Sequence, residues 1–341
     1  MDYMSSDPRP KILVLTPSPL LDEIMSPRAI KVLEGLGQVE WNRTGRDLSQ
    51  DEVMERIKGC SAVFTSWGPP LFDDELLDAA YELKIIGHAA GSIKRFIPPS
   101  VFERGVVVTH AANTIAASVA EWTLGMMLMG LRRVYTVDRK MQAGEAWPIY
   151  KELEPTGLYG KRVGIIGASH VGRALIRLLR PFDTDTIVYD PYLDVEDAAE
   201  MGVSRVNALD ELMATSDVIT NHAPTTEATR GMLDTRLWGL VKDGALFVNT
   251  ARADAADYDA LLVELQSGRF TAALDVFPEE PLANDSPFRS LPNVILSPHA
   301  AGLTIESKLR LGETVAEEFA RYFNGEPLHH QVTSNMLFKM A

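Results

Sequence analysis

The sequence has very little cysteine: Cys60 is the only one among 341 residues. A single thiol excludes an intramolecular disulfide and disfavours a cysteine-based metal site, which is typical of a protein from a reducing compartment. Cys60 itself is interpreted as a small buried hydrophobic residue. The first residues also lack a charged segment followed by an apolar core, so no signal peptide is expected and the predicted location is cytoplasmic.

Positive charge is scarce as well. Lysine and arginine total 33 against 47 acidic residues, which gives a formal net charge of −14 at pH 7. Nucleic acids and anionic membranes both need a basic surface, so this balance argues against either as a partner. It does not exclude a small anionic substrate, because one local arginine can bind an anion.

Long uninterrupted hydrophobic runs are absent. The most apolar stretch, Val119–Val134, contains two glycines and three charged residues. We therefore predict that it is too short and too polar to span a bilayer. The wider segment 115–135 is predicted to form one apolar helix, whose broad apolar face needs more than one covering surface. The pattern leaves open whether that surface is wholly intramolecular or a dimer contact.

Short apolar runs do alternate with helical patterns in the first third of the chain. The helices are predicted near 27–36, 50–57 and 73–81. This alternation predicts a parallel sheet covered on both faces, in which ligands bind at the carboxyl ends of the strands. The candidate loops are therefore 65–68 and 88–92. The predicted strands are 11–15, 39–41, 62–65, 83–86 and 106–109.

A second series of apolar runs begins near Arg162, in a chain long enough for two domains. Its six members match the strand count of a six-stranded doubly wound sheet. A final helix is predicted over 304–325. The predicted strands of this series are 163–166, 186–190, 217–221, 245–249, 272–276 and 293–297.

The first strand of the second series leads directly into a loop of small residues and then a helical pattern. Free backbone N–H groups at the start of such a helix favour a phosphate. Asp190 follows at the end of the next strand, where an acid binds the ribose hydroxyls of a dinucleotide. The glycine pattern is imperfect, because Ser169 stands at its middle position. The loop residues are Gly167, Ala168, Ser169, His170, Val171 and Gly172.

Ionisable residues recur directly after the later strands. Each alone has a structural interpretation, such as a surface charge, a solvated turn, a helix cap or a satisfied histidine. Together they include the parts needed for hydride transfer between a nicotinamide and a 2-hydroxy acid. Histidine suits the proton transfer, arginine suits the substrate carboxylate, and a carboxylate can fix the histidine tautomer. These residues are His222, Arg252, Asp275, Glu279, Glu280 and His299.

The chain resembles the D-isomer-specific 2-hydroxyacid dehydrogenases over nearly its whole length, through five ordered motifs at the family's spacing. The resemblance implies an α/β fold in which a Rossmann-like, doubly wound parallel-sheet NAD domain (113–301) is inserted into a smaller flavodoxin-like substrate domain (1–112 and 302–341). The motifs are GKRVGIIG at 160–167, NHAPTT at 221–226, VNTAR at 248–252, ALDVFPEEPL at 273–282 and NVILSPHAAG at 293–302.

The resemblance also implies roles for individual residues. His299 becomes the general acid/base, Glu280 rather than Glu279 its partner, and Arg252 the residue that binds the substrate carboxylate. The implied cofactor is NAD (NADH for reduction), because Asp190 would repel a 2′-phosphate; no metal is implied. The implied substrate contacts are Ala90, Gly91, Ser92, Arg252 and His299. The implied cofactor contacts are Gly167, Ala168, Ser169, His170, Val171, Gly172, Asp190, His222, Ala223, Pro224, Thr250, Ala251 and, on the nicotinamide side, Asp275.

Several positions depart from the family's usual residues. Ser169 requires a negative φ, and its hydroxyl could then donate to a phosphate, while His170 stands where arginine is common. Ala253 and Asp254 follow the arginine where glycines are usual. The segment 88–95 lacks the family's arginine, glycine pair and aspartate-asparagine, although Gly91 and the next residue can still present backbone N–H groups to a carboxylate.

The leading prediction is an NAD-dependent dehydrogenase of a small 2-hydroxy or 2-oxo acid. The altered segment 88–95 motivates an alternative, a non-catalytic NAD-binding regulator like the corepressors of this family. A third hypothesis is a dehydrogenase of another donor, such as formate or phosphite. The resemblance further implies a homodimer through the helix at 115–135. Trp67 and Trp147 are candidate substrate contacts, although a core or interface anchor is an equally good interpretation of Trp147.

Overall fold

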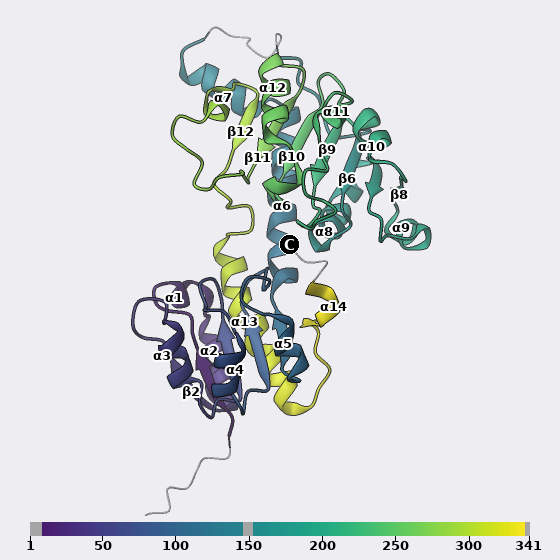
Figure 1. Ribbon diagram of the computed structural model, residues 1–341. Helices are drawn as coiled ribbons and strands as arrows, with labels where there is room; N and C mark the ends of the chain where they lie inside the picture. Colours follow the sequence, from purple (N-terminus) through teal and green to yellow (C-terminus); the bar gives the residue numbers. More distant parts are fainter. Residues whose placement is uncertain (1–8, 146–152, 338–341) are drawn as a thin grey trace, which may run out of the picture. The chain divides into compact units, whose positions relative to one another are not determined.

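The computed structural model describes residues 9–145 and 153–337, and the chain divides into two compact units. The first unit contains the described residues up to Ile115 and those from Leu303 onward, drawn in purple, blue and yellow in Figure 1. The second contains Ala116–Gly302, drawn in teal and green. Trp147 lies outside the described residues.

The first unit is built on a six-stranded sheet with the order β13-β5-β4-β3-β1-β2. Five strands are parallel, and β13 joins the edge antiparallel to β5. The strands are β1 (Lys11–Val14), β2 (Gln38–Trp41), β3 (Ala62–Thr65), β4 (Ile85–His88), β5 (Val107–His110) and β13 (Gln331–Val332). The helices are α1 (Leu20–Ile24), α2 (Pro27–Leu36), α3 (Gln50–Arg56), α4 (Asp74–Ala79), α5 (Pro99–Glu103), α13 (Ile305–Asn324) and α14 (Ser334–Leu337).

The predicted strand at 83–86 is wrong by two residues. The N–H of Leu83 still donates to the carbonyl of Ala80, in the turn that ends α4. The ladder therefore begins later, and His88 is the last residue of β4 rather than the first residue of a loop. This places its side chain among the buried residues of the sheet.

Helix α13 returns the end of the chain to the first unit and covers β4. Thr304 caps its N-terminus and Gly325, with φ +71°, ends it, as the sequence predicted. The close packing requires Gly87 in β4, because a Cβ there would lie 2.3 Å from Val315 Cγ1 and 2.6 Å from the ring of Phe319.

The second unit is built on a seven-stranded parallel sheet with the order β12-β11-β10-β9-β6-β7-β8. Strand order reverses on either side of β6, so the switch point lies where β6 and β9 end. The extra strand β8 was not predicted, because its two residues are polar. The strands are β6 (Arg162–Ile166), β7 (Asp185–Tyr189), β8 (Ser204–Arg205), β9 (Val218–Asn221), β10 (Leu246–Asn249), β11 (Thr271–Leu274) and β12 (Val294–Leu296). The α-helices lying wholly in this unit are α7 (Val134–Gln142), α8 (His170–Leu179), α9 (Val195–Met201), α10 (Leu209–Thr215), α11 (Thr235–Trp238) and α12 (Tyr258–Ser267).

The single helix predicted at 115–135 is also wrong, because the segment contains the end of α6 (Ala112–Leu131) and the start of α7. Arg133, with φ +53°, adopts a left-handed conformation that ends the helical path. Gly130 lets α6 pack closely on the sheet, since a Cβ there would lie 2.8 Å from the side chain of Leu246.

By length and composition α6 could cross a membrane, so the prediction that this stretch is too short and too polar is wrong. However, 44% of its most apolar window is buried within the protein, and length and composition alone are weak evidence for a membrane span. The absence of a membrane partner and the homodimer both stay predictions.

Candidate functional site

The loop between β6 and α8 fits a dinucleotide pyrophosphate. Gly167 has φ +93°, and a Cβ on it would lie 2.8 Å from the backbone nitrogen of Ala223. A Cβ on Gly172 would lie 2.2 Å from the carbonyl oxygen of Gly167, so α8 packs directly on the loop. Both glycines are therefore required, and the ten-residue helix α8 begins with its N–H groups at this turn.

Ser169 adopts the negative φ that its position requires, at −65°. It is the N-cap of α8, and its hydroxyl oxygen accepts from the N–H of Gly172 at 3.4 Å. A hydroxyl that accepts one bond keeps its own proton, which is then available to a phosphate oxygen. His170, the first residue of α8, is exposed.

Asp190 is the acid at the end of β7, and it also holds the glycine loop in place. One carboxylate oxygen accepts from the N–H of Ala168 and the other from the N–H of Tyr192, both at 2.8 Å. Each oxygen can accept a second hydrogen bond, so ribose hydroxyls can still bind. The same side chain thus joins the expected ribose site to the expected phosphate site.

Substituting Gly172 with alanine is expected to lower nicotinamide dinucleotide affinity about tenfold or more. The new methyl group must displace the backbone at Gly167, which carries the pyrophosphate loop. Titration of the dinucleotide by fluorescence measures the change. Gly125→Ala in α6 is the matched control, because an added Cβ there meets no atom within 4 Å. If the Gly172→Ala protein bound the dinucleotide as tightly as the wild type, the assignment of this loop as the pyrophosphate site would be contradicted.

The side chain of His222 points into the protein rather than toward a ligand. Its Nε2 lies 3.0 Å from the hydroxyl of Thr220, and its Nδ1 lies 3.5 Å from the hydroxyl of Thr250. Burial lowers the pKa of His222 to about 3, so the ring is neutral. The Thr250 hydroxyl also contacts that of Thr123 on α6 at 3.2 Å. The side chains at 222 and 250 therefore contact the protein itself, and cofactor contacts at these positions stay a prediction.

Two buried asparagines at the strand ends shape the cofactor loops, and sequence reasoning assigned them no role. The Oδ1 of Asn221 accepts from the N–H of Ala223 at 3.2 Å. The Oδ1 of Asn249 accepts from the N–H of Ala251 at 3.1 Å and from the amide of Asn221 at 3.2 Å. An asparagine two residues before a loop amide is the signal of an Asx turn, and it could have been recognised.

Asp275 is 1% exposed, and its carboxylate holds the loop that carries His299. The two oxygens accept from the N–H groups of Ala300 and Ala301, at 2.9 and 3.0 Å. The N–H of His299 donates to the carbonyl of Asp275 at 2.8 Å. Within the described residues, the Asp275 side chain therefore orients the loop that carries His299. The family resemblance implied a contact on the nicotinamide side instead and gave no sign of this role.

His299 and Glu280 form a hydrogen-bonded pair, with 2.7 Å between Nδ1 and Oε2. The other carboxylate oxygen accepts from the N–H of Phe277 at 3.0 Å. Burial alone would raise the pKa of Glu280, but the hydrogen bonds from His299 and Phe277 and the charges of His299 and Arg252 lower it. Glu280 is thus an ionised acceptor that fixes one nitrogen of the histidine ring. His299 holds this place with φ +54°.

Arg252 follows β10, and its charge acts on Glu280. The side chain is half-buried, and its Nη1 donates to the carbonyl of Ala251 at 2.7 Å. The next residues form a short 3-10 helix, Ala253–Ala255, whose Asp254 pairs with Arg230 at 3.0 Å. The residues that replace the usual glycines therefore build a defined turn after the arginine.

The candidate substrate loop of the first unit follows β4. His88 lies beneath it, with Nδ1 2.8 Å from the hydroxyl of Thr65, and its pKa is lowered to about 3 by burial and by His110. His110 Nδ1 contacts the carbonyl of Gly91 at 3.0 Å. Ala90 is buried, whereas residues 91 and 92 are partly exposed. The loop is thus anchored by His110, whose ring contacts its backbone at Gly91.

Comparisons with known proteins find related sequences. A family model described as "D-isomer specific 2-hydroxyacid dehydrogenase, NAD binding domain" matches residues 124–301. The chain is 34% identical to a D-3-phosphoglycerate dehydrogenase of Methanocaldococcus jannaschii over 92% of its own length and 58% of that enzyme. It is 31% identical to a glyoxylate reductase of Korarchaeum cryptofilum, over 89% of its length and 94% of that enzyme.

Solved structures of other proteins have the same fold as this chain. A phosphoglycerate oxidoreductase from Rhizobium etli superposes with a TM-score of 0.79 at 29% identity, covering 95% of this chain and 99% of that one. D-mandelate dehydrogenase of Rhodotorula graminis shares the fold with a TM-score of 0.84 at 20% identity, covering 96% of this chain and 98% of that one. The chain therefore has the predicted Rossmann-like α/β fold.

Proposed function

Because the chain belongs to the family of D-isomer-specific 2-hydroxyacid dehydrogenases, we propose that it interconverts a small 2-oxo acid and the corresponding 2-hydroxy acid. The observation that carries the proposal is the hydrogen-bonded pair of His299 and Glu280, with the charge of Arg252 acting on it. All three follow strands of the sheet whose glycine loop fits a dinucleotide. This combination supplies a proton donor, its orienting acceptor and a carboxylate-binding fork in one unit.

The proposed cofactor is NAD(H), which when bound supplies or accepts the hydride. The glycine loop and the first turn of α8 hold its pyrophosphate, and Asp190 accepts the ribose hydroxyls. A 2′-phosphate at that ribose would meet a carboxylate whose two oxygens are fixed by Ala168 and Tyr192. Like charges repel at this distance, so NADPH is expected to bind less tightly than NADH.

His299 performs the proton transfer in the proposed reaction. During reduction, Nε2 donates its proton to the carbonyl oxygen as the carbonyl carbon receives the hydride, so one hydride and one proton give the hydroxyl group. Glu280 keeps Nδ1 protonated and stabilises the positively charged ring before the transfer. Arg252 binds the substrate carboxylate through two N–H groups and orients the carbonyl. Oxidation uses the same groups in reverse.

A panel of 2-oxo acids assayed with NADH and NADPH in parallel tests the proposal. We expect reduction of at least one acid, with kcat/KM about tenfold or more higher for NADH, and a smaller preference in the Asp190→Ala protein. The panel includes formate and phosphite with NAD, since oxidation of either would indicate a different donor. NADH binding without turnover of any acid would favour the non-catalytic regulator and contradict the proposal.

A further inference from the structure

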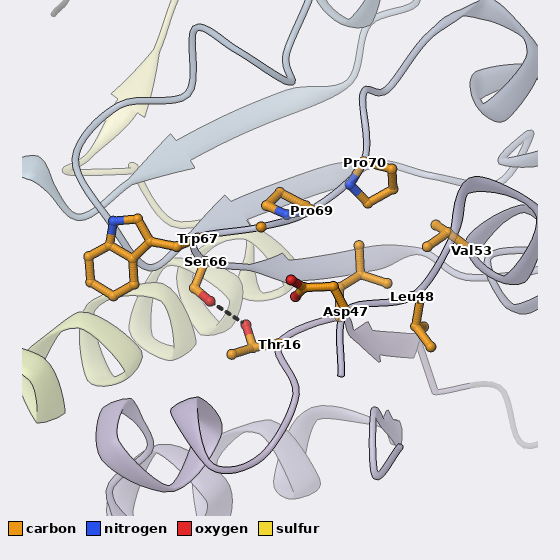
Figure 2. A pocket seen from close by; sticks show the side chains of 10 residues that line it. Thr16, Asp47, Leu48, Val53, Ser66, Trp67, Pro69 and Pro70 are labelled. Carbon is orange, nitrogen blue, oxygen red and sulfur yellow. Dashed lines mark hydrogen bonds between the residues drawn. The ribbon is translucent and has the colours of Figure 1, made fainter. Parts of the chain in front are cut away.

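Buried hydroxyl groups need hydrogen-bond partners, and the partners show what each group holds in place. In the first unit, the hydroxyls of Thr16 and Ser66 lie 2.7 Å apart and bind each other (Figure 2). In the second unit, the hydroxyl of Tyr258 instead joins two separate segments of the candidate site. Tyr258 begins α12 and is 5% exposed, and none of the five sequence motifs contains it.

The first partner of the Tyr258 hydroxyl lies in the segment that holds Glu280. The hydroxyl donates to the carbonyl of Val276 at 2.6 Å. That carbonyl belongs to the same planar peptide group as the N–H of Phe277, which donates to Oε1 of Glu280 at 3.0 Å. Because the peptide group is rigid, fixing its carbonyl also fixes the direction of its N–H. The other oxygen of Glu280 binds Nδ1 of His299 at 2.7 Å.

The second partner belongs to the turn that carries Arg252. The Tyr258 hydroxyl accepts from Nδ2 of Asn249, which is fully buried, at 3.1 Å. The same Nδ2 donates to the carbonyl of Arg252 at 3.3 Å, so both of its hydrogen atoms are used. The Oδ1 of Asn249 accepts from the N–H of Ala251 at 3.1 Å. One hydroxyl therefore connects the backbone of the arginine turn to the segment of the glutamate.

The ring of Tyr258 is held independently of its hydroxyl. It packs edge-to-face against Phe288 and Phe277, with 5.8 and 6.4 Å between the ring centroids. Burial raises the pKa of the hydroxyl, and the charges of Glu280 and Asp275 raise it further, so the group stays protonated and can donate. Replacing Tyr258 with phenylalanine therefore removes the hydroxyl and leaves the ring in place.

The bond to Val276 also acts on the charge of Glu280. Donation to a carbonyl polarises its peptide group, which strengthens the hydrogen bond that the N–H of the same group donates. The N–H of Phe277 is one of the groups that lower the pKa of Glu280. The Tyr258 hydroxyl thus supports the ionised carboxylate that binds His299.

We infer that Tyr258 is a positioning residue of the proposed reaction. Its hydroxyl fixes Glu280, and through it His299, relative to the turn that carries Arg252. The inference rests on the proposed function for the reaction itself, whereas the hydrogen bonds that carry it do not depend on which substrate the protein takes.

The test measures the kinetic effect of Tyr258→Phe in two backgrounds. In the wild type, we expect kcat for reduction of the best acid in the panel to fall about tenfold, because Glu280 orients the proton donor less well. The affinity for NADH should stay within about twofold, since the hydroxyl contacts neither the glycine loop nor Asp190. In the Glu280→Gln protein, the same substitution should lower kcat less than about twofold, because the residue through which the hydroxyl acts is already changed.

Thr271→Val is the matched control for the loss of a buried hydroxyl in the same unit. The Thr271 hydroxyl donates to the carbonyl of Ala245 at 3.3 Å, at the opposite end of β11 from Asp275. Its kcat should stay within about twofold of the wild type, even if its Tm falls. Equal loss of kcat from Tyr258→Phe in both backgrounds, or a Tyr258→Phe protein with wild-type kcat, would overturn the inference.

A spectroscopic measurement tests the contact without turnover. In protein labelled with [15N]phenylalanine, the amide proton of Phe277 reports its hydrogen bond to Glu280, and Phe277→Leu assigns the resonance. We expect this resonance to move upfield in Tyr258→Phe and to keep its position in Thr271→Val. An unchanged resonance in Tyr258→Phe would overturn the inference even if the protein reduced 2-oxo acids. A shifted resonance in a protein that reduces no 2-oxo acid would support the positioning of Glu280 and contradict the proposed function.

Discussion

Replacing His299 with alanine is expected to lower kcat by about 10²- to 10⁴-fold, because the side chain is the proposed proton donor to the substrate oxygen. Its position depends on the backbone as well as on Glu280, since residue 299 has φ +54°. Asparagine tolerates that conformation better than alanine, so His299→Asn is the more informative variant. It keeps the loop conformation and an amide near Glu280 but cannot transfer a proton.

The measurement is steady-state reduction of the best acid in the panel, together with NADH titration of the same preparations. The affinity for NADH should stay within about twofold, because the glycine loop and Asp190 contact neither side chain of the pair. Turnover near the wild-type rate in both variants would remove His299 from the reaction. Loss of NADH affinity in the asparagine variant would instead indicate a structural role.

Substituting Arg252 with lysine is expected to lower kcat/KM about 100-fold. Lysine keeps the positive charge, which contributes to the lowered pKa of Glu280, but an ammonium group cannot form the two parallel hydrogen bonds that a carboxylate receives from a guanidinium. The loss should therefore appear with every 2-oxo acid, whatever its side chain.

The control for this experiment is Arg230→Lys, an exposed arginine that pairs with Asp254 next to the same turn. Its kcat/KM is expected to stay within about twofold of the wild type, since an exposed ion pair contributes little. If Arg252→Lys behaved like this control, the carboxylate would be bound elsewhere.

Helices and strands with strong local signals were predictable from sequence. The bounds 27–36 and 62–65 agree with α2 and β3, and the caps at 304 and 325 delimit α13. Elements without such signals were missed. Two polar residues gave no sign of β8, and a left-handed arginine at 133 has no sequence pattern that distinguishes it from a helical one.

For the site, the sequence predicted where the residues lie along the strands but not where their side chains point. Sequence motifs correctly placed His222, Thr250 and Asp275 at the ends of strands. They could not show that these side chains bind the protein, because orientation depends on neighbours such as Thr123 and Ala300, which are far away in sequence. Burial and hydrogen bonding, which only the fold reveals, decide whether a polar residue at a strand end contacts a ligand or supports one.

The return of α13 to the first sheet has a consequence for synthesis on the ribosome. The apolar face around Gly87 is covered by Val315 and Phe319, more than 220 residues later in the chain. Residues 116–302 contain the whole of the second sheet, so this unit can complete its folding while the first waits for its last helix. A nascent chain halted after residue 302 is therefore expected to bind chaperones, because its second unit is complete while the sheet of its first unit is still uncovered.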